Sequence, residues 1–140
     1  MNICIVGTGY VGLVTAACFA EMGNAVCYID IDQAIIDRLK SGQIHIYEPG
    51  LKSLVKRNSE QVRLNFSTNL TEGVENALFI LNCVGTPSKP DGSCDLSYVH
   101  QVVSQIGQVM NEYKIIINKS TVPVGTADQE IGRASCRERV

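Results

Sequence analysis

Apolar residues along the chain follow two alternating patterns, which predict strands and helices in turn. Short, continuous apolar runs rich in β-branched residues are typical of buried strands. Between them, apolar residues recur every three or four positions, which is typical of helices with one buried face. The predicted strands are 2–6, 25–29, 62–66, 78–84 and 114–118, and the predicted helices are 10–22, 33–40, 49–58, 70–75 and 96–111.

The order of these elements predicts the fold class. Strands that are apolar along their whole length must be covered on both faces, and strands that alternate with helices build a parallel sheet. We therefore predict an α/β fold with a doubly wound parallel sheet over residues 1–129. Asp32 and Asp95 are expected to cap helices, and Pro49 is expected in the first turn of one.

Residues 130–140 depart from this pattern. The segment is polar and basic, with three arginines within seven positions, and it resembles the translation of a sequencing adapter. We predict a non-native tail without function here, and a solvated basic helix is the alternative.

Composition excludes several function classes. The chain has 140 residues, 45% of them hydrophobic, which is enough for one packed core. The net charge of −2 leaves no basic stripe for a nucleic acid or a membrane surface, so neither partner is predicted. The N-terminus lacks a secretory signal and no apolar run has the length of a membrane span, so a cytoplasmic protein is expected.

Cysteine and histidine usage predicts neither disulfides nor a metal site. The six cysteines form no CxxC pair and mostly lie within apolar segments, so we expect reduced, small hydrophobic residues. His45 and His100 lack the spacing of metal ligands and are interpreted as solvated side chains.

The sequence GTGYVG at 7–12 carries the candidate chemistry. It directly follows a predicted strand and opens a predicted helix, which is the context of a dinucleotide-binding fingerprint. Gly7 permits the tight turn, Gly9 lets the backbone approach a pyrophosphate, and Gly12 lets the helix pack closely on the strand. The alternative is a glycine turn in a flavin-binding or purely structural domain.

Two further features of this motif point to NAD. Tyr10 and Val11 begin the helix, whose N-terminal N–H groups and dipole favour the negative charge of phosphates. Asp30 ends the next strand, 18 positions after Gly12, where its carboxylate can accept hydrogen bonds from the adenosine ribose. Because that charge repels a 2′-phosphate, NAD is predicted rather than NADP, and the sheet is predicted to be of the Rossmann type.

Three further segments carry a family resemblance: IYEPGL at 46–51, VGTPSKPDGSCDLSYV at 84–99 and KSTVPVGT at 119–126. Together with the glycine motif they resemble the UDP-glucose and GDP-mannose dehydrogenase family, and the DLSYV segment is more similar to its UDP-glucose branch. One departure is Ile35, because the family often has Lys or Arg five positions after the ribose-binding acid.

The resemblance implies additional cofactor contacts after the fourth and fifth strands. These are the threonines Thr86 and Thr121, with backbone from Val84, Gly85 and Ser120. Ligands of open α/β sheets lie at the carboxyl ends of the strands, which agrees with this placement. The alternative is that each threonine only serves a turn before its following proline.

The resemblance also implies an activity for the whole protein. The family oxidises a sugar alcohol to a carboxylate by two hydride transfers to NAD, through a cysteine thiohemiacetal and thioester. For the UDP-glucose branch the product is UDP-glucuronate, a polysaccharide precursor, and the full-length protein is expected to be a homodimer.

This chain is expected to supply the NAD-binding half and to be inactive alone. The resemblance places the catalytic cysteine and its lysine, asparagine and aspartate helpers beyond residue 140. It implies at most a role for Thr121 in positioning substrate or water, and Cys94 is interpreted as an inert loop thiol. The alternatives are a dehydrogenase for GDP-mannose or a UDP-N-acetylhexosamine, or a free-standing NAD-binding module.

Overall fold

Five parallel strands form one sheet in the part of the chain that the computed structural model describes, residues 1–7 and 9–129. The predicted tail at 130–140 lies outside the described residues. The strands are β1 (Asn2–Val6), β2 (Ala25–Ile29), β3 (Leu64–Ser67), β4 (Phe79–Asn82) and β5 (Ile115–Asn118), and the helices are α1 (Tyr10–Glu21), α2 (Gln33–Lys40), α3 (Leu51–Glu60), α4 (Leu70–Asn76) and α5 (Ser97–Val109).

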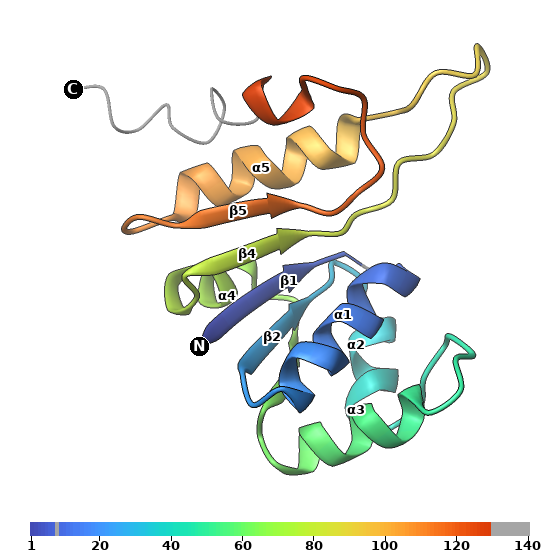
Figure 1. Cartoon of the computed structure of the whole chain (residues 1–140), viewed down its shortest axis with the longest axis vertical. Coiled ribbons are helices and arrows are strands. Elements are labelled where there is room, and N and C mark those ends of the chain that lie inside the picture. Colours follow the sequence, from blue (N-terminus) through green and yellow to red (C-terminus); the bar gives the residue numbers. More distant parts are fainter. Residues whose placement is uncertain (8, 130–140) are drawn as a thin grey trace.

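The strand order is β3-β2-β1-β4-β5, which places the switch in direction between β1 and β4. All four pairings are parallel, and their registers align the strand ends: Val6 is paired with both Ile29 and Asn82, and Asn82 with Asn118. The arrowheads in Figure 1 accordingly point the same way. This arrangement confirms the predicted doubly wound parallel sheet.

Alternate residues of the strands enter two cores, one on each face of the sheet. On one face, Ile3 and Ile5 of β1 pack with buried residues of α1, α2 and α3. On the other, Cys4 and Val6 pack with residues of α4 and α5. The α1 residues in the first core include Ala16, Ala17 and Ala20, whose small side chains let the helix approach the sheet closely.

Helix and strand ends differ from the prediction where the backbone turns into the left-handed region. Gly50, with φ of 83°, is the N-cap of α3, so Pro49 lies before the helix rather than in its first turn. Val62 has φ of 58° and its N–H donates to the Ser59 carbonyl, so β3 begins only at Leu64.

The two predicted caps differ in outcome. Asp32 caps α2, because its carboxylate accepts from the N–H groups of Ala34 and Ile35. The N-cap of α5 is Leu96 rather than Asp95, although the Asp95 carboxylate accepts from the Ser97 N–H at 3.0 Å.

Cysteines of the described chain are free thiols at five positions. Cys4 and Cys83 are buried, Cys27 and Cys94 are half-buried, and Cys18 is exposed. Within residues 1–7 and 9–129, no helix has the length and apolar character needed to cross a bilayer. The same residues contain no group of three His, Cys, Asp or Glu side chains that could hold a metal ion.

Candidate cofactor-binding site

All predicted site residues follow a strand and lie at one edge of the sheet. The segments after β1, β2, β4 and β5 lie together there, because parallel strands with aligned registers end side by side (Figure 1). The structure therefore brings together the glycine turn, Asp30, the segment 84–86 and the segment 120–121.

Gly7 makes the turn after β1 and cannot be replaced without a clash. Its φ is 125°, and a Cβ there would lie 2.6 Å from the carbonyl carbon of Cys83 and 2.7 Å from the nitrogen of Val84. The Gly7 N–H donates to the Ile29 carbonyl at 3.1 Å, which ties the turn to the end of β2. The backbone after β1 thus lies in close contact with the end of β2 and with the residues that follow β4.

Gly9 is a glycine that the described fold itself does not require. Its φ is −75°, an ordinary value, and the nearest atom to a Cβ there would be the Cys83 carbonyl oxygen at 3.8 Å. By contrast, a Cβ on Gly12 would lie 2.5 Å from the Gly7 carbonyl oxygen. Gly12 is needed for helix packing, whereas the bare backbone at Gly9 leaves room for a ligand.

The N-terminus of α1 is suited to an anion. Gly9 is the N-cap and offers no side chain, and the first turn contains no acidic residue. Tyr10 and Val11 are exposed there. Because the first N–H groups of a helix lack partners within it, they and the helix dipole favour a phosphate at this position.

Asp30 follows β2 and is only 2% exposed. Its Oδ1 accepts from the Asp32 N–H at 2.8 Å. Its Oδ2 is buried and has no hydrogen-bond partner among the described residues. A buried carboxylate oxygen without a donor is costly, so this atom fits a ligand that brings hydroxyl groups to it.

The electrostatic surroundings of Asp30 are mixed. Burial is the main cause that raises the pKa of Asp30 above its ordinary value, and the Asp32 carboxylate adds to this effect. The hydrogen bond from the Asp32 N–H and the nearby His45 imidazole act in the opposite direction. Donors from a bound ribose would likewise favour the ionised carboxylate.

The segments after β4 and β5 are joined by hydrogen bonds. The Ser120 hydroxyl donates to the Val84 carbonyl at 2.8 Å, and the Lys119 N–H donates to the Asn82 carbonyl at 2.9 Å. A Cβ on Gly85 would have no heavy atom within 4 Å, so open space surrounds this residue. Thr86 is half-buried and Thr121 is exposed beside this space.

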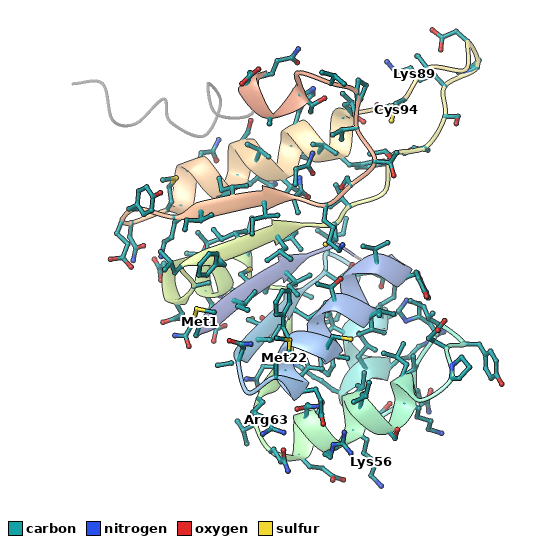
Figure 2. All side chains as sticks on the ribbon, viewed as in Figure 1. Met1, Met22, Lys56, Arg63, Lys89 and Cys94 are labelled. Atoms are coloured by element: carbon teal, nitrogen blue, oxygen red, sulfur yellow. The ribbon has the colours of Figure 1, made fainter. Side chains whose placement is uncertain are left out.

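Cys94 connects the two threonines through their backbone. Its thiol lies 3.8 Å from the Thr86 carbonyl oxygen and 3.7 Å from that of Thr121, within the range of weak S–H···O hydrogen bonds. Figure 2 shows Cys94 on the long loop between β4 and α5, with Lys89 on the same loop. Sequence analysis identified Cys94 only as an inert loop thiol and missed this contact.

Three other side chains lie at this edge that the sequence did not predict as site residues. Glu48, which precedes α3, accepts a hydrogen bond from the Tyr10 hydroxyl and thereby raises the pKa of Tyr10. Tyr28 and Asn82 are fully buried, and their side-chain polar atoms have no partner among the described residues. No sequence motif marks these contacts, because each depends on the packing of separate segments.

Ile35 stands where a cation was expected and has a packing role. It lies in the first turn of α2 and its half-buried side chain packs against the core beneath α1, α2 and α3. From outside β2 and its turn, the His45 imidazole acts on Asp30 and lowers its pKa.

Comparisons with known proteins agree with this geometry. Residues 1–139 match the family model for the UDP-glucose/GDP-mannose dehydrogenase family, NAD binding domain. A UDP-glucose 6-dehydrogenase of Pseudomonas aeruginosa is 46% identical over 99% of this chain and 32% of its own length. One of Bacillus subtilis is 49% identical over 89% of this chain and 27% of its own length.

Solved structures show the same domain. A ternary complex of GDP-mannose dehydrogenase from Pseudomonas aeruginosa superposes with a TM-score of 0.92 at 35% identity, over 96% of this chain and 32% of that one. A UDP-glucose dehydrogenase from Pyrobaculum islandicum gives a TM-score of 0.89 at 38% identity, over 94% of this chain and 31% of that one.

The chain spans about a third of the length of the curated relatives it matches. The match covers the parallel sheet and every segment of the edge described above. The chain belongs to the UDP-glucose/GDP-mannose dehydrogenase family and carries its NAD-binding domain.

Proposed function

We propose that the edge formed by the segments after β1, β2, β4 and β5 holds NAD through named residues. Gly7, Gly9 and Gly12 form the turn under the pyrophosphate, with the first N–H groups of α1 at Tyr10 and Val11. Asp30 accepts hydrogen bonds from the adenosine ribose. The remaining contacts come from Val84, Gly85, Thr86, Ser120 and Thr121.

One observation carries this proposal: after β2, which neighbours β1 at the switch point of the sheet, the Asp30 Oδ2 is buried without a partner among the described residues. Ligands of open α/β sheets bind where the strand order reverses, and a ribose offers two hydroxyl donors. The bare backbone at Gly9, the N-cap of α1, leaves space for the adjoining pyrophosphate.

The test is calorimetric titration of the purified chain with NAD and NADP. We expect binding of NAD and at least about tenfold weaker binding of NADP, because the Asp30 carboxylate repels a 2′-phosphate. In Asp30→Ala the loss of charge-assisted hydrogen bonds is expected to weaken NAD about 10- to 100-fold. The two cofactors should then bind with similar Kd.

The matched control is Asp37→Ala. Asp37 is an exposed carboxylate on α2 that accepts from the Gln33 side chain at 2.8 Å. This variant changes the net charge as Asp30→Ala does, so it should bind NAD like the wild type. Equal weakening in both variants would mean that general charge, and not ribose recognition, governs affinity.

For the whole protein we propose NAD-dependent oxidation of UDP-glucose to UDP-glucuronate. Bound NAD accepts a hydride at its nicotinamide ring. Support comes from the higher identity of the UDP-glucose 6-dehydrogenases, 46% and 49%, than of a GDP-mannose 6-dehydrogenase of Azotobacter vinelandii, 40%. We further propose that Thr121, exposed beside Thr86, positions the substrate or the attacking water, and that the whole protein is a cytoplasmic homodimer.

The alternative substrates are GDP-mannose and a UDP-N-acetylhexosamine. A UDP-N-acetyl-D-mannosamine dehydrogenase of Methanococcus maripaludis is 38% identical over 99% of this chain. Sequence identity within the NAD-binding domain therefore separates the candidate substrates only weakly. Assays of the full-length protein with each nucleotide sugar, following nicotinamide absorbance, separate these cases. Turnover with none of the three would favour the alternative of an NAD-binding module without turnover.

A further inference from the structure

The phenol ring of Tyr28 lies in the core between the sheet and α1. The residue lies on β2 and is 0% exposed, and its ring meets that of Phe66 on β3 edge to face, with centroids 5.9 Å apart. These apolar contacts explain the ring. They do not explain why the side chain carries a hydroxyl group.

The hydroxyl end of the ring points to the base of the glycine turn. A Cβ built on Gly12 would lie 3.4 Å from the Cε2 of Tyr28, 3.4 Å from the Cβ of Cys83 and 2.5 Å from the Gly7 carbonyl oxygen. Cε2 is bonded to the carbon that carries the hydroxyl. The phenol therefore ends where β1, α1 and the end of β4 meet.

At that junction the hydroxyl has no partner. The Tyr28 oxygen is buried and makes no hydrogen bond within the described chain. Burial raises the pKa of Tyr28, and the Asp30 carboxylate and the Cys83 thiol add to the rise, so the group stays protonated and is a donor at neutral pH. A buried donor without an acceptor is rare in native proteins and calls for an explanation.

Asp30 is not that acceptor. The Oδ2 of Asp30, two residues further along the chain, is also buried and also lacks a partner among the described residues. Had the two atoms been within reach, each would satisfy the other. Both atoms therefore lack a partner among residues 1–7 and 9–129, and both lie at the edge to which we assign NAD.

We propose that the Tyr28 hydroxyl is a positioning group of the dinucleotide site, donating its hydrogen bond toward the pyrophosphate at the glycine turn through one ordered water. This inference rests on the proposed NAD site. Its chemistry is that of the adjacent α1 N-terminus: a donor at the place where negative charge is favoured.

Tyr28→Phe isolates the hydroxyl, because the ring and its contact with Phe66 remain. We expect the Kd for NAD to rise about tenfold, the size of one hydrogen bond to a charged group. The same rise is expected for ADP-ribose, which has the pyrophosphate but lacks nicotinamide. The unliganded variant should unfold at the same or a higher temperature than the wild type, because it no longer buries an unpaired donor.

Tyr113→Phe is the matched control, since Tyr113 is 75% exposed and precedes β5, at the opposite end of the strands. It should leave both affinities unchanged. In the wild type, NMR with labelled tyrosine should show the Tyr28 hydroxyl proton exchanging more slowly once NAD is added, a measurement that needs no variant.

The outcomes separate the two proposals. If the wild type binds no NAD, the proposed cofactor site fails and this inference fails with it. If the wild type binds NAD but Tyr28→Phe binds NAD and ADP-ribose equally well, only the role of the hydroxyl is overturned. A loss seen with NAD and absent with ADP-ribose would also overturn it, because the effect would then lie at the nicotinamide.

Discussion

At the scale of single residues, the glycine turn separates positions needed for folding from positions needed for a ligand. Gly7 has a left-handed backbone, and a Cβ there would clash with the backbone of Cys83 and Val84, directly after β4. Gly9 has an ordinary backbone conformation, and a Cβ there would make only an ordinary contact, 3.8 Å from the Cys83 carbonyl oxygen. The same residue type thus serves two different purposes two positions apart, and substitution can distinguish them.

We predict that alanine at Gly7 lowers stability, whereas alanine at Gly9 lowers NAD affinity. Gly7→Ala should lower the free energy of unfolding by about 2–4 kcal/mol, from backbone strain and the clash with Cys83. Gly9→Ala should change it by less than about 0.5 kcal/mol, yet weaken NAD binding because the new methyl group occupies the ligand's space. Urea unfolding and calorimetric titration measure the two quantities. Unchanged NAD affinity in Gly9→Ala would argue against the pyrophosphate placement.

At the scale of elements, α2 shows how a short helix is held in a fixed position beside the candidate site. It has only eight residues, too few to be stable alone, and depends on burying Ile36 and Leu39 and on its cap. Its N-cap Asp32 also donates its backbone N–H to Asp30. The start of α2 therefore helps to orient the carboxylate to which we assign the ribose.

Asp32→Ala should cost about 1 kcal/mol of stability, because the N–H groups of Ala34 and Ile35 lose their acceptor. Asp32→Asn keeps a capping oxygen and should lose only a few tenths of that energy, which makes it the matched comparison. Chemical denaturation of both variants measures the difference. Equal losses in the two would show that the charge of Asp32, rather than its cap geometry, stabilises α2.

Elements with a clear apolar period could be predicted from the sequence, and the ends of some could not. Burial on one or both faces leaves a direct trace in residue spacing, as in β1 and α2. The starts of α3 and β3 depend instead on left-handed backbone at Gly50 and Val62. Glycine hints at such a conformation, but a valine there is set by the hydrogen bonds at the end of α3.

The candidate site shows the same division. Asp30 and the glycine turn lie within one strand-turn-helix-strand unit, so spacing along the chain is enough to predict them. The Cys94 thiol lies beside the carbonyl oxygens of Thr86 and Thr121, and the ring of Tyr28 ends beside Gly12. These neighbours come from separate strands and loops that meet only when the sheet is assembled, which is why sequence reasoning did not find them.

At the scale of the whole molecule, the buried thiols of the described chain are not in the reactive form. Burial raises the pKa of Cys27 and of Cys83 to about 11 and that of Cys4 further, so these thiols stay protonated at neutral pH. A thiolate is the reactive form in thioester chemistry. The Cys94 thiol lies within weak hydrogen-bonding range of two backbone carbonyl oxygens.

We therefore predict that this chain binds NAD but does not reduce it when UDP-glucose is added. The physical reason is that hydride transfer requires the sugar to be held against the nicotinamide, and the described residues supply the edge that we assign to the cofactor. Nicotinamide absorbance measures the reaction, with the full-length protein as the active control and calorimetry to verify that the chain has bound NAD. Turnover by the chain alone would show that its own residues, with Cys18 and Cys94 the first to test, complete a catalytic site.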